Sequence, residues 1–482
     1  MVYWTTTAFL ILYWATVLVA IIVVLRDNRN PIRSIAWVLA LLFFPLGGLI
    51  CYIFFGRSLR GQHMISRYHK RKIITKMAPR HVDLDTLNLS RAERNLIKLS
   101  RNLSSSFYTI NNEIDIFTTG AEKFESLKRD LENAEKSIFL QYYIFLDDNI
   151  GYEIADILMR KASEGVDVRV IYDHVGSFSA KNKFFRKMAA AGVNIHPFFR
   201  VTFPQFANRV NWRNHRKIVI IDGVIGYIGG MNIADRYVTG TNNGQPWRDT
   251  HFRLRGDIVE SLIYSFVVDW NFKNLPERME YPYAPDCGIR NMLGMQLVTS
   301  GPTGDWDNLA LCFLKAISSA TRNIYIQTPY FLPTESLMRA LEAAALAKID
   351  VRIMIPRKSD SRLLRYASFS YVTKCLRAGM KVYLYNPGML HAKGMIIDDN
   401  LVTAGSTNFD FRSFENNFEC NLFIYDEGVN RRMRDIFFAD MAQCRKLTFA
   451  TWKKRPVFQR AVESLVRLFS PILYTAIKGR IV

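Results

Sequence analysis

The chain has 482 residues, of which 49% are hydrophobic, so its length suggests about three domains and its composition is ample for large buried cores. The formal net charge of +21 predicts attraction to an anionic partner, either nucleic acid or acidic lipid headgroups. Six cysteines lie scattered without a C-x-x-C pair, which argues against a disulfide framework or a zinc site and favours buried thiols in a reducing compartment.

Two apolar segments open the chain, at residues 2–25 and 35–55, and each is long enough to cross a bilayer, which takes about 20 residues. A signal peptide is disfavoured for the first because no basic region precedes it and no small-residue cleavage site follows. The second contains Pro45, which would suit a buried core helix, but transmembrane helices tolerate such residues. We expect a transmembrane hairpin over residues 1–56, which favours lipid over nucleic acid as the anionic partner.

Residues 57–110 are predicted to be a basic juxtamembrane connector, because the second apolar segment is followed by a run of basic residues with no acidic one among them. A hairpin places both of its ends on one side of the membrane, and the positive-inside rule then places the body in the cytoplasm. Arginines at positions 26, 29 and 33 oppose this orientation. The connector either binds acidic headgroups, at about 1 kcal/mol per Lys or Arg near the surface, or is simply solvated.

Two halves with the same order of elements follow. Residues 138–145 parallel residues 324–331, and in each half helices alternate with strands until a strand that carries His-x-Lys. This alternation predicts an α/β fold for each half, with a mixed, largely parallel sheet flanked by helices. We place the halves at residues 111–285 and 286–450, with a proline-containing linker within 273–292.

Each half contains one copy of His-x-Lys-x4-Asp followed by a Gly-x-x-Asn segment. The copies are His215, Lys217, Asp222 and Asn232, and His391, Lys393, Asp398 and Asn408. Side chains two apart on a strand face the same way, so the His and Lys of each copy project together, whereas the Asp falls at the strand end, where it favours a turn. One copy alone would be a weak signal, but two copies with matched spacing argue against chance. A reaction that needs two histidines would be assembled only where the halves meet.

Residues 451–482 are predicted to be a C-terminal amphipathic segment. Apolar residues recur at helical spacing from Phe458 to Leu473 among several basic residues, and Pro471 is expected to bend or end the helix. Such a helix lies in a membrane interface or docks on the protein itself, and we favour the membrane. An aromatic and basic stretch at 197–212 either guides lipid into the site or packs under a long loop.

The residue types of the two motifs suit transfer at a phosphodiester. One imidazole attacks phosphorus to form a phospho-histidine, while the other protonates the leaving alcohol and then deprotonates the incoming one. The lysines and asparagines, Asn232 and Asn408 included, would hold the phosphate oxygens by charge and hydrogen bonds. Because these side chains neutralise the charge, we expect neither a metal nor a cofactor.

The paired pattern resembles the HxKxxxxD motifs of the phospholipase D superfamily, and its flanks resemble bacterial cardiolipin synthases. These flanks are residues 212–217, 229–232, 247–251 and 327–331. The resemblance covers essentially the whole chain and implies two halves packed about a pseudo-two-fold axis. It also implies that an acidic residue fixes the tautomer of each histidine, and the matching positions are Asp249 and Glu419. A surface carboxylate or a structural ion pair is the alternative for both, and the role of Glu415 stays open.

The resemblance implies an enzyme of the bacterial inner membrane that makes cardiolipin from two phosphatidylglycerol molecules, releasing glycerol through a phosphatidyl-histidine. The superfamily's usual order makes His215 the nucleophile and His391 the acid/base; the reverse stays open, as does the oligomeric state. A hydrolytic phospholipase D, or a transferase using another alcohol, would need the same residues, because exclusion of water decides between transfer and hydrolysis. The two apolar segments together with the flanking resemblance argue against a membrane-anchored nuclease, and the two intact motifs argue against a lipid-binding scaffold. The expected partners are phosphatidylglycerol and an anionic membrane surface, without nucleic acid.

Overall fold

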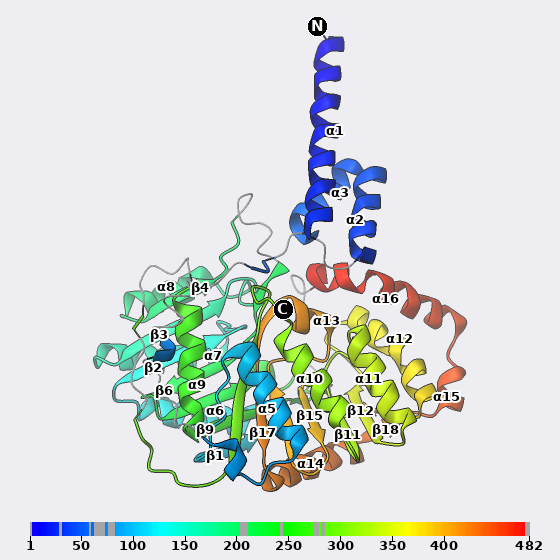
Figure 1. Ribbon diagram of the computed structural model, residues 1–482. Helices are drawn as coiled ribbons and strands as arrows, with labels where there is room; N and C mark the ends of the chain where they lie inside the picture. The colour runs from blue at the N-terminus through cyan, green and yellow to red at the C-terminus, as the bar shows by residue number, and fades with distance from the viewer. Residues whose placement is uncertain are drawn as a thin grey trace. The chain divides into compact units, whose positions relative to one another are not determined.

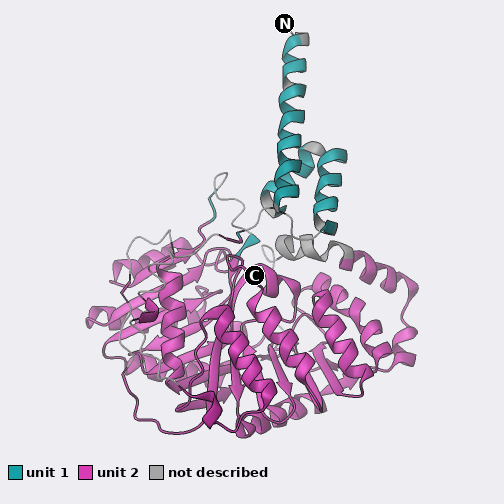
Figure 2. Ribbon diagram, in the orientation of Figure 1, with its two compact units in different colours: residues 1–59, 201–212 teal, residues 60–200, 213–482 magenta. Residues whose placement is uncertain are grey.

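The computed structural model (Figure 1) describes most of the chain, which forms two compact units (Figure 2). The smaller unit contains residues 1–59 and 201–212, and the larger contains residues 60–200 and 213–482. The described residues are 2–27, 31–56, 59–61, 73–75, 82–202, 211–241, 244–272, 279–280 and 285–477.

Helices make up the described N-terminal part of the smaller unit. These are α1 (Val2–Asp27), α2 (Pro31–Phe43), α3 (Pro45–Cys51) and the π-helix η1 (Tyr52–Gly56). By length and composition α1 can cross a membrane, from Trp4 to Arg26. The second apolar segment is not the continuous helix that we expected, because the chain breaks at Phe44, where Pro45 lacks an N–H and restricts the residue before it. The 13 residues of α2 rise only about 20 Å, less than the roughly 30 Å of a hydrocarbon core.

The first half of the larger unit contains a seven-stranded sheet in the order β1-β9-β7-β6-β2-β3-β4 (Figure 1). Its strands are β1 (Asn112–Phe117), β2 (Ser137–Tyr142), β3 (Asp167–Asp173), β4 (Asn194–Phe198), β6 (Ile218–Ile221), β7 (Ile225–Gly229) and β9 (His251–Gly256). Its helices are α6 (Gly120–Glu132), α7 (Asn149–Ser163), α8 (Asn182–Ala190) and α9 (Ile258–Trp270). Ile138 and Leu140 join the core under α6 and α7, whereas Phe139, which points to the other face, stacks on Phe266 of α9 at 5.3 Å.

The second half repeats this arrangement in a nine-stranded sheet of order β10-β17-β16-β15-β11-β12-β13-β18, to which β5 adds by pairing with β17. The strands of this path are β10 (Gly294–Ser300), β11 (Asn323–Gln327), β12 (Asp350–Pro356), β13 (Lys381–Tyr385), β15 (Gly394–Ile397), β16 (Leu401–Gly405), β17 (Asn417–Tyr425) and β18 (Cys444–Lys446). Its main helices are α10 (Asn308–Ser319), α11 (Glu335–Leu346), α12 (Arg362–Ala378) and α14 (Glu427–Ala442), with the short α13 (Phe411–Glu415) before β17.

The sheets are mixed, as expected, but the expectation that they are largely parallel is wrong. In the first half β2–β3 and β3–β4 are parallel, while the other four pairings are antiparallel. Helices connect β2, β3 and β4, which allows parallel pairing, whereas a tight turn joins β6 to β7 and forces these strands to be antiparallel. In that turn Asp222 and Gly223 have φ of 54° and 70°.

Part of the predicted connector belongs to the folded body. Residues 91–104 form α5, whose Leu96 and Ile97 are buried in the core of the second half. The side-chain amide of Gln296 on β10 donates to the backbone carbonyls of Ile97 and Ser106 at 3.3 and 3.1 Å. Although α5 precedes the first half in the sequence, it packs against the second.

The C-terminal segment forms α15 (Phe449–Lys453) and α16 (Val457–Ile477), and α16 does not end at Pro471. One face of α16 packs on α12 and buries Val466. Other apolar side chains of the helix are exposed, so docking on the protein leaves apolar surface for another contact. In the aromatic stretch, the rings of Phe198 and Phe199 pack against Phe418, with centroids 5.3 and 5.7 Å away. For these two residues the contact favours a packing role over guiding lipid into the site. Residues 203–210 lie outside the described part of the chain.

Candidate active site

Two short parallel strand pairs join the halves beside the motifs. β5 (Arg213–Asn214) pairs with the start of β17, and β14 (Met389–Leu390) pairs with β8 (Trp247–Arg248). The residue after β5 is His215, whose backbone N–H donates to the carbonyl of Phe418 at 2.9 Å. The residue after β14 is His391, whose backbone N–H donates to the carbonyl of Arg248 at 2.7 Å. Each motif histidine is therefore placed against a strand of the other half.

Each histidine is also paired with a carboxylate of the other half. Nδ1 of His215 lies 3.0 Å from both carboxylate oxygens of Glu419, and Nδ1 of His391 lies 2.6 Å from Oδ2 of Asp249. Both carboxylates have 0% exposure, which removes the surface-carboxylate alternative. Holding Nδ1 leaves Nε2 as the nitrogen for chemistry. The pairing is crossed between the halves, and the sequence spacing alone does not reveal this.

The motif lysines are buried beside the histidines, as the two-residue period of a strand predicts. Nζ of Lys217 donates to the backbone carbonyl of His215 at 2.5 Å. Nζ of Lys393 lies 3.3 Å from Oδ2 of Asp249 and 2.7 Å from Nδ1 of His391. The second lysine therefore lies against its imidazole and disfavours a positive charge there.

The motif aspartates, which we grouped with the catalytic residues, lie at the far end of the same strands, where they bind backbone N–H groups. Asp222 accepts hydrogen bonds from the backbone N–H groups of residues 135–137 at 2.9, 2.7 and 2.8 Å. Asp398 does the same for residues 321–323, at 2.9, 2.8 and 3.1 Å. Each follows its histidine by roughly 20 Å of extended chain, at about 3.3 Å per residue. They hold the start of β2 and of β11.

Both motif asparagines are buried. The side chain of Asn232 accepts from the backbone N–H of Ile144 at 3.2 Å and donates to the hydroxyl of Tyr237 at 2.8 Å. That hydroxyl lies 3.5 Å from Nδ1 of His391, so Asn232 reaches this histidine through Tyr237. Asn408 is 2% exposed in the second half.

The Gly pair and its Gly-Ser counterpart fit the two carboxylates differently. A Cβ at Gly230 would lie 2.1 Å from Oδ1 of Asp249, so this position has to be glycine for the carboxylate to lie where it does. Ser406 takes the matching position in the second half, and its hydroxyl donates to Oε2 of Glu419. The side-chain amide of Asn417 donates to Oε1 at 3.1 Å. Glu419 is thus held by neutral donors in addition to His215.

Two buried arginines that we did not single out in the sequence join the halves behind the histidines. Arg216 donates through Nη1 to both oxygens of Asp269 at 2.7 and 2.6 Å, and through Nε to the backbone carbonyl of Glu419 at 3.2 Å. Arg248 donates through Nε to Asp440 at 3.3 Å. Both arginines adjoin predicted site residues in the sequence. A charged residue directly beside a predicted buried site residue was the available signal, because a charge that is buried with its neighbour requires a buried partner.

The two histidine–carboxylate pairs differ in charge. Burial raises the pKa of Glu419 to about 7, although Lys217 and hydrogen bonds act in the opposite direction. Burial alone would raise the pKa of Asp249, but Lys393 and His391 outweigh it and hold that pKa below its usual range. Burial and Lys393 lower the pKa of His391 to about 4. At neutral pH His391 is therefore a neutral imidazole beside an ionised carboxylate, whereas Glu419, beside His215, gains or loses a proton near pH 7.

Comparison with known proteins supports the resemblance. A family model described as "Cardiolipin synthase, PLD-like domain" matches residues 127–244 and 313–441, with one motif in each stretch, and a model described as "Phospholipase_D-nuclease N-terminal" matches residues 15–57. The chain is 40% identical over 467 residues to the "Major cardiolipin synthase ClsA" of Bacillus subtilis (strain 168), covering 95% of this chain and 97% of that protein. This chain belongs to the cardiolipin synthase family of the phospholipase D superfamily.

Other family members match over nearly their whole length. The chain is 37% identical to a "Cardiolipin synthase" of Listeria monocytogenes serotype 4a (strain HCC23), over 96% of this chain and 98% of that one. The solved phosphatidylserine synthase of Haemophilus influenzae Rd KW20 has a TM-score of 0.60 and 18% identity, covering 81% of this chain and 99% of that chain, a likeness of fold. The family assignment, the two-half α/β fold and the N-terminal apolar helix are thus confirmed.

Proposed function

We propose that the protein is a cardiolipin synthase: it transfers the phosphatidyl group of one phosphatidylglycerol to the terminal hydroxyl of another and releases glycerol. The observation that carries the proposal is the crossed pairing of His215 with Glu419 and of His391 with Asp249, because each motif histidine is held by a carboxylate of the other half. Relatives that match the chain over nearly its whole length are named cardiolipin synthases.

The proposed reaction has two steps at one phosphorus. In the first, Nε2 of the nucleophilic histidine forms a bond to phosphorus, the bond from phosphorus to the glycerol oxygen breaks, and the other histidine gives its proton to that oxygen. In the second, the terminal hydroxyl of a second phosphatidylglycerol gives its proton to that same histidine, its oxygen bonds to phosphorus, and the phosphorus–nitrogen bond breaks. Lys217 and Lys393 supply positive charge to the phosphate oxygens, Asn232 and Asn408 supply amide donors, and no metal or cofactor takes part.

The electrostatics favour His391 as the nucleophile and His215 as the acid. A nucleophile has to be unprotonated, and the pKa of His391 is about 4. An acid has to carry a proton at the start, and the His215–Glu419 pair can hold one because the pKa of Glu419 is about 7. A proton that Glu419 takes up can move along the hydrogen bond to Nδ1 of His215. The pair then consists of an imidazolium next to a carboxylate. This order is the reverse of the one that the superfamily resemblance implies.

Product analysis tests the proposed reaction. Detergent-purified full-length protein would receive phosphatidylglycerol alone, with a chelator present, and the products would be measured by mass spectrometry. We expect cardiolipin and glycerol in equal amounts. Phosphatidic acid in place of cardiolipin would make the protein a hydrolase, and a requirement for added metal would contradict the scheme.

We further propose that both apolar N-terminal segments insert into the bacterial inner membrane as a hairpin, in which α1 crosses the bilayer and the second segment straightens at Phe44 to cross back, and that the catalytic body faces the cytoplasm. The apolar length of α1 and the basic residues after position 56 support this arrangement. A cysteine introduced near residue 62, in a chain whose Cys51 is replaced by serine, should resist an impermeant thiol reagent in intact cells. Ready labelling would place the body on the other side.

A further inference from the structure

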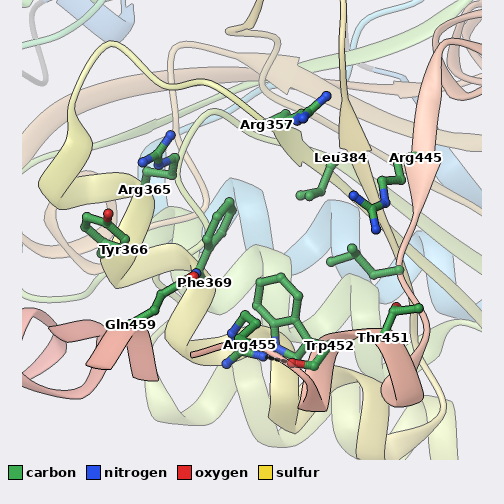
Figure 3. A pocket seen from close by; sticks show the side chains of 11 residues that line it. Arg357, Arg365, Tyr366, Phe369, Leu384, Arg445, Thr451, Trp452, Arg455 and Gln459 are labelled. Carbon is green, nitrogen blue, oxygen red and sulfur yellow. Dashed lines mark hydrogen bonds between the residues drawn. The ribbon is translucent and has the colours of Figure 1, made fainter. Parts of the chain in front are cut away.

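A second cationic site lies in the second half, and none of the motif residues line it. It is a pocket of about 380 Å³ between α12, the β-sheet and the C-terminal helices. Four arginines from different elements line it: Arg357 after β12, Arg365 on α12, Arg445 on β18 and Arg455 after α15. Figure 3 shows these side chains around the space that Phe369 and Trp452 also border.

Three of the four arginines lack a carboxylate partner among the residues that the structure describes. Arg455 pairs with Glu463 at 2.9 Å and lies over the Trp452 ring at 3.7 Å. By contrast, Arg357 has only a 3.5 Å contact with an amide oxygen, and Nε of Arg365 is buried without a hydrogen-bond partner in the described part of the chain. Like charges that share one hollow raise the free energy of the empty pocket. Planar guanidinium donors suit the oxygens of a phosphate group, which would neutralise them.

The surroundings of the pocket indicate a lipid as the source of that phosphate. The elements that line it, α15 and the start of α16, also expose large apolar side chains: Phe449 is 42% exposed, Val457 71% and Phe458 80%. Gln459, the next residue, lines the pocket itself. A free phosphate ion would gain nothing from these exposed side chains, whereas a phospholipid would place its headgroup in the pocket and its glycerol and acyl region against apolar residues of the same two helices.

We propose that this pocket binds the phosphate group of an anionic membrane phospholipid, at a site separate from the two histidines, and so holds the second half against the bilayer. The pocket would only hold the protein at the membrane surface, so this role is independent of the reaction that the histidines perform.

Lipid-dependent thermal stability of the full-length protein in an uncharged detergent tests the proposal. The probes are dihexanoyl phosphatidic acid, dihexanoyl phosphatidylcholine and inorganic phosphate. The test variant is R365Q/R445Q, and the control R186Q/R431Q removes two exposed arginines from α8 and α14. Phosphatidic acid should raise the melting temperature of the wild type, and the concentration for half the shift should rise about tenfold or more in R365Q/R445Q, which loses two charge-assisted donors, but not in R186Q/R431Q.

Each other outcome overturns part or all of the proposal. An unchanged half-saturating concentration in R365Q/R445Q would remove the pocket as the binding site. The same shift with inorganic phosphate would remove the lipid, and the same shift with phosphatidylcholine would remove the need for net negative charge. If R365Q/R445Q melts early without lipid, R445Q alone, an exposed position, gives the same test. Turnover of phosphatidylglycerol in the same preparations reports separately on the proposed reaction.

Discussion

The Glu419→Gln variant tests the pair that we propose to hold the catalytic proton. Glu419 is fully buried, and both of its carboxylate oxygens lie 3.0 Å from Nδ1 of His215. Glutamine keeps the size but removes the charge, so the imidazolium form of His215 loses a charge-assisted hydrogen bond of about 1.5–3 kcal/mol. At about 1.4 kcal/mol per factor of ten, turnover should fall about 10- to 150-fold.

The pH dependence should change in the same variant. The acid must carry its proton, and the pKa of Glu419 is about 7, so wild-type turnover should fall as pH rises through about 7. Glutamine neither titrates nor carries the charge that stabilises the imidazolium of His215, so in Glu419→Gln the fall should move to lower pH. Asp249→Asn should lower turnover but keep the fall near pH 7, because the pKa of Asp249 is already below its usual range and that of His391 is about 4.

Initial rates of glycerol release from phosphatidylglycerol in mixed micelles, measured between about pH 5 and 9, would check both effects. Glu427→Gln is the matched control, because it removes an exposed carboxylate of the same size in the first turn of α14. Circular dichroism would establish that each variant is folded. Wild-type turnover in Glu419→Gln, with its fall near pH 7 intact, would refute the acid role of the pair.

Three other variants or measurements separate chemistry from structure. Peptide mapping of the trapped phospho-enzyme should find the label on His391; a label on His215 would restore the superfamily's usual order. Asp222→Ala removes three hydrogen bonds to backbone N–H groups and should destabilise the fold by about 2 kcal/mol or more in chemical denaturation, while turnover per folded molecule stays within about twofold. A lost rate at full stability would instead place Asp222 in the chemistry. Gly230→Ala should abolish turnover because its Cβ would lie 2.1 Å from Asp249, whereas Gly394→Ala, whose Cβ would meet nothing nearer than 3.7 Å, should keep it.

The sequence predicted the contacts within each motif better than the contacts between the halves. The two-residue period of a strand is a local property, and it placed each motif lysine beside its histidine. The crossing of the pairs depends on β5 meeting β17 and on β14 meeting β8, contacts two residues long between segments about 200 and 140 residues apart. No local pattern encodes such a contact.

The errors in the fold have the same origin. Helices that alternate with strands predicted parallel pairing correctly for β2, β3 and β4, but the pattern was extended to strands that a tight turn connects. Residues 91–104 looked like part of a connector because their partner, the core around β10 and α10, lies some 200 residues further along the chain. Transmembrane helices tolerate proline, but here α2 ends at Phe43, just before Pro45.

The asymmetry of the two halves fits the different roles that we propose for the two histidines. A symmetric site would give both histidines the same proton affinity, yet the reaction needs one unprotonated and one protonated histidine at the start. Asp249 lies against Gly230, which offers no side-chain donor, and it pairs with the ammonium group of Lys393. Asp249 therefore stays ionised, and the charge of Lys393 keeps His391 neutral. Glu419 is longer, accepts from Ser406 and Asn417, and takes up a proton near pH 7 beside His215. The two halves thus differ at the positions that surround the histidines: Gly230 in the first half corresponds to Ser406 in the second, and Asp249 corresponds to Glu419. These are the positions where the proposed mechanism needs two different roles.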